Sequence, residues 1–187
     1  VLGFALYSTN THIKDINKAI HYITLSANQD YTEAQYFLGL IYYSNKKLKN
    51  INKAVHYLTL AANKHHSYAQ FLLGAMYQEG KYVTQDSQKA INLLTLSANQ
   101  DNKYAQYTLG SFYLYIGENI NKSYYYLHMA AKQGIIEAIF LLGFIYSMGK
   151  DLKRDINKAI HYYNDASSLK HLQSKNNLAI IYKNGIY

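Results

Sequence analysis

The chain contains no cysteine, no proline and no tryptophan, and its 187 residues include a single arginine, Arg154. Without cysteine it can form neither a disulfide framework nor a zinc site built from thiolates. The same absence fits a reducing compartment without requiring one, so we expect an intracellular, cytoplasmic protein.

Long apolar runs are also missing. The longest nearly unbroken apolar stretch, residues 138–149, is shorter than the ~20 residues that a membrane helix needs, and the start of the chain does not resemble a signal peptide. We therefore expect no transmembrane segment. Proline ordinarily helps to end helices and shape turns, so other residues must do so here.

A short pattern recurs along the whole chain. Leu-Gly, or Leu-Ala at its last occurrence, places its second residue at positions 3, 39, 74, 110, 143 and 179, in steps of 36, 35, 36, 33 and 36 residues. Each of the last five has a small residue five positions before it and a tyrosine three positions after it. These offsets fit one helix face, and a period of this length fits one helical hairpin.

A second block, opening with Lys-Ala or Lys-Ser, predicts the other helix of each hairpin. Three residues before each lysine lies an Asp or Asn, whose side chain can accept hydrogen bonds from first-turn N–H groups. We predict N-caps at Asp15, Asn50, Asp86, Asn119 and Asp155. The first helices should end near Asn45, Gly80, Gly117 and Gly149, which tolerate the left-handed conformation.

The small residues predict how the hairpins pack. Glycine inside a helix costs ~1 kcal/mol relative to alanine, so Gly39, Gly74, Gly110 and Gly143 should be compensated by a close contact with a neighbouring helix. The 22 tyrosines are expected to fill gaps between layers rather than to form a binding row.

One unit shows the whole pattern: Ala69, Leu73-Gly74, Tyr77, Gly80, Val83, Asp86, Lys89-Ala90 and Ser97-Ala98. These residues resemble the Sel-one-like repeat (SLR), a relative of the tetratricopeptide repeat, and the resemblance extends over the whole chain. A plain tetratricopeptide array is the alternative, but its period is about 34 residues. At the ends of the second helices glycine occurs only as Gly134, so we expect individual turns to deviate at Asp30, His65, Asp101 and Lys170.

The period and the resemblance together predict an all-α fold. We expect an α-solenoid, a right-handed superhelix of stacked antiparallel helical hairpins with a period of about 36 residues. Residues 1–187 would form a single repeat array of about five hairpins plus a sixth first helix. Neither end has a polar capping repeat, so we expect a fragment of a longer solenoid.

Catalytic signals are weak. We find no nucleophile elbow, zinc-protease, phosphate-loop or dinucleotide motif, and we expect no enzyme activity, no cofactor and no metal. His21, His56 and His161 share one register position about a repeat apart, which is too far for one ion. The adjacent pair His65-His66 lacks an identifiable third ligand. A hydrolytic solenoid would resemble a cysteine-rich branch of the family, which this chain does not match.

The resemblance implies a concave wall of first helices that binds proteins. Positions three and six after the leading small residue should share a face, and several carry large apolar side chains. The predicted partner-binding lane comprises Phe37, Leu40, Leu72, Tyr115, Leu141, Phe144 and Met148. The alternative is that these residues pack between neighbouring helices.

The net charge of +8 supports a second hypothesis, a salt-sensitive binder of nucleic acid or of an acidic surface. The predicted basic edge comprises Lys46, Lys47, Lys49, Lys150, Lys153 and Arg154, in loops between first and second helices. A single arginine leaves little capacity for base readout, so nucleic acid is the weaker partner. We expect a non-enzymatic scaffold or adaptor that binds other proteins within a larger assembly.

Overall fold

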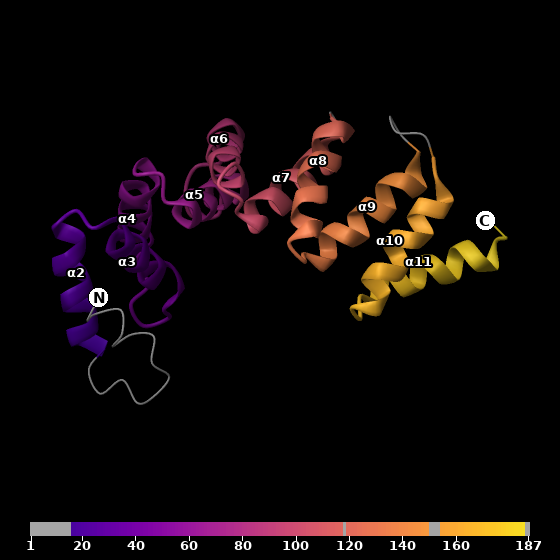
Figure 1. Cartoon of the computed structure of the whole chain (residues 1–187). Helices are drawn as coiled ribbons and strands as arrows, with labels where there is room; N and C mark the ends of the chain where they lie inside the picture. Colours follow the sequence, from indigo (N-terminus) through magenta and orange to yellow (C-terminus); the bar gives the residue numbers. More distant parts are fainter. Residues whose placement is uncertain (1–15, 118, 150–153, 186–187) are drawn as a thin grey trace. The chain divides into compact units, whose positions relative to one another are not determined.

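The computed structural model describes residues 16–117, 119–149 and 154–185, and within these ranges the chain forms ten α-helices and no strand. In chain order they are α2 (Ile16–Asn28), α3 (Thr32–Ser44), α4 (Ile51–Asn63), α5 (Ser67–Glu79), α6 (Ser87–Ala98), α7 (Lys103–Ile116), α8 (Ile120–Lys132), α9 (Ile136–Met148), α10 (Ile156–Ser168) and α11 (Leu172–Lys183) (Figure 1). None of these helices is long and apolar enough to cross a membrane.

The chain divides into two compact units, residues 1–100 and 101–187, called unit 1 and unit 2 below. In unit 1, α3 pairs with α4 and α5 with α6, while α2 packs on α3 and α4 on α5. In unit 2, α7 pairs with α8 and α9 with α10, while α8 packs on α9 and α10 on α11. The predicted all-α fold of stacked helical hairpins is therefore confirmed. The single continuous array, its superhelical handedness and its place in a longer solenoid stay predictions.

Each second helix in the described ranges from α4 onward begins behind a capping side chain. Oδ1 of Asn50, Asp86, Asn119 and Asp155 accepts the backbone N–H three residues later, at 3.0, 2.9, 2.9 and 3.0 Å. Such a cap stabilises a helix by about 1 kcal/mol. The fifth predicted cap, Asp15, lies outside the described residues.

The helix glycines lie against the second helix of the same hairpin. A Cβ added to Gly39 would lie 2.8 Å from Leu58 Cγ, and one added to Gly110 would lie 2.6 Å from Leu127 Cγ. Gly74 and Gly143 are equally close to the equivalent residues Leu94 and Tyr163. Real Cβ atoms do not approach other atoms this closely, so a larger side chain would push the paired helices apart.

The turns that follow the second helices are more uniform than the sequence suggested. Asp30, His65, Asp101 and Lys170 have φ of 68, 62, 58 and 69°, close to the 82° of Gly134. The expectation that these turns deviate from the glycine turn was wrong. All four non-glycine residues adopt the left-handed conformation, although residues with a side chain usually avoid it. The backbone N–H groups of Asp30, His65, Gly134 and Lys170 each donate to a carbonyl in the last turn of the preceding helix, as Lys170 does to Ser167 at 3.0 Å.

The first helices α3, α5, α7 and α9 end as predicted, at Asn45, Gly80, Gly117 and Gly149, and the three glycines are left-handed. Asn45 leaves α3 in an extended conformation, with φ −77° and ψ 116°. Its side chain accepts the Lys47 N–H at 3.0 Å instead, which closes the turn without a positive φ.

Tyrosine stacks join the two helices of a hairpin. Tyr146 on α9 also meets Tyr124 of the preceding hairpin edge-on, at 6.0 Å, as expected of a column that fills gaps between layers. The stacked pairs are Tyr42/Tyr57 at 6.1 Å, Tyr113/Tyr126 at 6.2 Å and Tyr146/Tyr162 at 5.8 Å between ring centroids. A lysine from the first turn of the second helix covers the first ring of each pair, at 5.2, 5.2 and 5.0 Å. These contacts combine ring stacking with cation–π attraction.

Buried glutamines of the first helices α3, α5 and α7 take part in polar joints near the ends of the hairpins. Gln70 and Gln106 each accept a hydrogen bond at Oε1 from a glutamine at the end of their own hairpin, Gln100 at 2.7 Å and Gln133 at 2.9 Å. Gln70 also donates to the carbonyl of Ala62 at 3.1 Å, in the preceding hairpin. These amides satisfy polar groups that would otherwise be buried without a partner.

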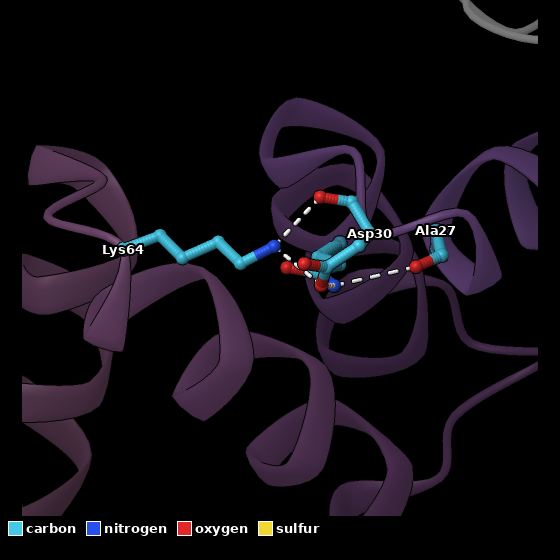
Figure 2. A network of polar contacts seen from close by, with 4 residues as sticks. Ala27, Asp30 and Lys64 are labelled. Carbon is cyan, nitrogen blue, oxygen red and sulfur yellow. Dashed lines mark hydrogen bonds and ion pairs between the residues drawn. The ribbon is translucent and has the colours of Figure 1, made fainter.

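The first of these joints is built differently (Figure 2). Gln35 donates to Ala27 O at 3.3 Å and to Asp30 Oδ1 at 3.0 Å, but Lys64 stands where two other repeats have Gln100 and Gln133. Lys64 donates to Asp30 O at 2.6 Å and pairs with its carboxylate. The hydrogen bonds from Lys64 and Gln35 lower the pKa of Asp30. Among the described residues Gln35 Oε1 has no hydrogen-bond partner.

Candidate protein-interaction surfaces

The predicted partner-binding lane separates into half-buried and exposed residues. Phe37, Leu72 and Leu141 are half-buried and pack against hydrophobic core clusters, and Leu40 is also half-buried. The remaining three, all in unit 2, are exposed: Tyr115 by 92%, Met148 by 45% and Phe144 by 37%. The half-buried residues of the lane thus fit the alternative of packing between helices, and the three exposed residues fit the alternative of a partner-binding surface.

The exposed residues of unit 2 follow a register. Tyr115 and Met148 both lie ten residues after the leading alanine of their helix, and Phe144 lies six after it. The six-residue position of α11 is Ile180, which is 56% exposed. We call Tyr115, Phe144, Met148 and Ile180 the apolar row. Large apolar residues recurring in register on successive first helices are unusual for a solvated face.

Unit 1 does not carry this row. Its ten-residue positions are Ser44 and Glu79, both exposed and polar, and its six-residue positions are the half-buried Leu40 and Ala75. The apolar row is therefore a property of unit 2 and not of the repeat itself.

A cavity of about 180 Å³ borders one end of this row. Ile180 and Ile181 of α11 line it, together with Ile156 and Tyr163 of α10 and the exposed Arg154 just before α10. The cavity is too small for a drug-sized molecule, for which ligand pockets of ~300 Å³ or more are typical. It can admit one apolar side chain of a partner.

The predicted basic edge is only partly described. Lys46, Lys47 and Lys49 are exposed in the loop between α3 and α4 of unit 1, and Arg154 is exposed in unit 2. Lys150 and Lys153 lie outside the described residues. Lys81, which is not part of the predicted edge, lies in the loop between α5 and α6. It approaches the ring of Tyr82, as Lys49 does.

Some histidines have structural roles, and His161 Nε2 lies 3.5 Å from Asp165 Oδ2. His66 caps α5, with Nδ1 accepting the Ala69 N–H at 3.2 Å and Nε2 lying 3.1 Å from Glu33 Oε2. His21, His56 and His161 are exposed. Within the described ranges no three His, Cys, Asp or Glu side chains are grouped so that they could hold a metal ion.

The repeats match a known family. The Sel1 repeat model matches residues 2–31, 32–66, 67–102, 103–135 and 136–171, that is, most of the chain. From the second repeat on, each match contains one first helix and one second helix as observed. No curated protein is significantly similar in sequence.

Solved structures with the same arrangement are similar over almost the whole chain. A protective antigen of uropathogenic Escherichia coli, c5321, which has an SLR fold, is 28% identical, with a TM-score of 0.91 over 99% of this chain and 40% of that one. A Sel1 repeat protein from Oxalobacter formigenes is 26% identical, with a TM-score of 0.82 over 99% of this chain and 77% of that one. The chain thus spans less than half the length of the Escherichia coli antigen.

Proposed function

Because the chain belongs to the Sel1 repeat family, we propose that it is a non-enzymatic scaffold that holds a partner protein on the first helices of unit 2. Sel1 repeat proteins typically mediate protein interactions and are generally non-catalytic. The resemblance seen in the sequence is confirmed at the level of the family. Membership in a larger complex and a cytoplasmic location stay predictions.

The observation that carries the proposal is the apolar row. Its four side chains are exposed at register positions where unit 1 has polar or half-buried residues. Full burial of a large apolar side chain contributes about 1.5–3 kcal/mol, so covering one that is already partly buried contributes about 1 kcal/mol. The row supplies the kind of anchors around which protein interfaces concentrate their binding energy.

A photo-reactive phenylalanine analogue tests where the partner lies. Placed at Tyr115 on α7, it should cross-link to the partner in the native source, where mass spectrometry then identifies the protein. The matched control is Tyr125 on α8, which is 58% exposed and belongs to the same unit but to a second helix. Cross-linking at Tyr125 and none at Tyr115 would place the partner on the opposite helices and refute the proposal.

Substitution of two anchors tests their energetic role. Phe144→Ala with Met148→Ala should weaken binding of the identified partner by about 30-fold, because about 2 kcal/mol of apolar contact is lost. The matched control removes two exposed leucines of second helices in unit 1, Leu25→Ala and Leu96→Ala, and should leave the affinity unchanged. Equal losses in both double variants would contradict a localised surface.

A further inference from the structure

Two loops of neighbouring hairpins in unit 1 bring lysines to one tyrosine. Lys49, between α3 and α4, donates from Nζ to the Tyr82 hydroxyl at 3.0 Å and lies 4.7 Å from its ring centroid. Lys81, between α5 and α6, has its Nζ 5.3 Å from the same centroid. Two ammonium groups that are distant in sequence are therefore gathered around a single phenol.

Packing, rather than charge, holds this arrangement. The Tyr82 ring meets Tyr43 of α3 edge-on, at 6.0 Å and 90°, and both rings pack against the hydrophobic cluster that contains Leu58 and Leu73. The anchored ring fixes one loop against the other, so both ammonium groups stay beside the phenol despite their mutual repulsion. An arrangement that holds like charges together is prepared for a ligand of opposite charge.

The surroundings add little negative charge. Most carboxylates of unit 1 already have cationic or histidine partners: Asp30 with Lys64, Glu33 with His66, and Asp86 with Lys89. In the part of unit 1 that the structure describes, no ion pair joins a carboxylate, Glu79 included, to Lys46, Lys47, Lys49 or Lys81. The hydrogen bond from Lys49, together with the charges of Lys49 and Lys81, lowers the pKa of the Tyr82 phenol, as expected at a positive potential.

We propose that Lys49, Lys81 and the Tyr82 hydroxyl form a docking site for an acidic segment of a partner protein. The exposed Lys46 and Lys47 extend the site along the α3–α4 loop. A carboxylate placed between the two ammonium groups accepts charge-assisted hydrogen bonds from both, and the phenol supplies a third donor. This surface is distinct from the apolar row, and the inference does not depend on it.

The geometry favours a polypeptide over a nucleic acid. Proteins that bind single strands stack bases on exposed aromatic faces, but the Tyr82 ring is already contacted by Lys49, Lys81 and Tyr43. Unit 1 also contains no arginine, so it lacks the forked donors that read base edges and clasp phosphates. Two lysine ammonium groups beside a phenol suit the single charges of Asp and Glu side chains.

Fluorescence anisotropy with the whole chain tests the site. The probes are a labelled glutamate-rich peptide, a glutamine-rich peptide of the same length, and a labelled oligothymidine, each measured at low and at moderate salt. The variants are Lys49→Gln/Lys81→Gln and a charge-matched control, Lys132→Gln/Lys175→Gln, which removes two exposed lysines of unit 2. Circular dichroism of every variant checks that the fold is intact.

We expect the glutamate peptide to bind at low salt and the glutamine peptide not to bind. The Lys49→Gln/Lys81→Gln variant should bind the glutamate peptide about tenfold more weakly than wild type, and the affinity of the control variant should fall by less than about twofold. Tyr82→Phe keeps the ring that holds the loops and should lose about twofold. Equal losses in the two double variants would overturn the proposal by showing that only net charge matters. Tighter binding of oligothymidine, lost in the Lys49/Lys81 variant, would overturn it in favour of nucleic acid.

Discussion

The left-handed turns of unit 2 allow a direct test of how this chain ends its second helices. Lys170 follows α10 with φ 69°, and Gly134 follows α8 with φ 82° at the equivalent position. Lys170 is exposed, so replacing its side chain removes little packing. A Cβ added to Gly134 would meet no atom within 4 Å, so alanine there changes only the backbone preference. The two sites therefore isolate one variable, the cost of a side chain on a left-handed residue.

The expected magnitudes have opposite signs. A left-handed residue with a side chain costs about 1–2 kcal/mol, and glycine loses about 0.5–1 kcal/mol more chain entropy on folding than alanine does. Lys170→Gly should thus stabilise unit 2 by about 0.5–1 kcal/mol, and Gly134→Ala should destabilise it by a similar amount. For a chain of this size each change shifts the melting temperature by about 2–4 °C or less.

Urea denaturation followed by circular dichroism measures both variants, and amide hydrogen exchange locates the change. Exchange is needed because repeat arrays depart from two-state unfolding, so that only the repeats beside the substituted turn should respond. The double variant should have nearly wild-type stability, since the sites are separate and the effects add. A Lys170→Gly variant that is less stable than wild type would refute the reasoning.

Four other substitutions test the helix caps, the close helix contacts and the first joint. Asn119→Ala should lower the free energy of unfolding by about 1 kcal/mol at every pH. The backbone N–H bound by Asp86 lowers the pKa of its carboxyl, so the stability that this cap contributes is present above the ordinary pKa of an aspartate and is lost as the pH falls. Denaturation across acidic pH should show this dependence in the wild type and not in Asp86→Ala. Gly110→Ala should cost about 1–3 kcal/mol, because its Cβ would lie 2.6 Å from a leucine Cγ on α8, and a neutral result by urea denaturation would contradict the close contact. Lys64→Gln should raise stability in the same assay by about 1 kcal/mol, because the buried Gln35 Oε1 would gain a donor, and a loss would show that the ion pair is the stronger joint.

Local features of this fold can be read from the sequence with little ambiguity. The capping side chains act within three residues of themselves, so Asn50 and Asp155 mark helix starts without knowledge of the neighbours. The helix glycines recur with the period of the hairpin, and a regular packing contact explains a regular glycine. The repeat boundaries followed from these two signals together.

Features that depend on neighbouring elements could not be read in this way. Leu40 and Phe144 occupy the same register position in their helices, yet Leu40 is half-buried and Phe144 is 37% exposed. The left-handed conformation of His65 and Lys170 could not be predicted from the sequence, because glycine, the residue that usually indicates it, is absent at these positions. Tyr82 was missed because its role depends on a loop 33 residues earlier in the chain.

The glutamine joints and the lysine joint described above have a consequence for how such a protein can change in length. A glutamine joint needs a donor amide at the end of the second helix, as in Gln100. The first joint instead needs Lys64 at that position and Asp30 in the preceding turn as its partner. A repeat duplicated or deleted across unlike joints would bring together partners that do not match. The repeats that carry these joints are therefore interchangeable only with repeats that have the same kind of joint. The polar groups at their borders, rather than their apolar cores, limit which of them can be duplicated or deleted.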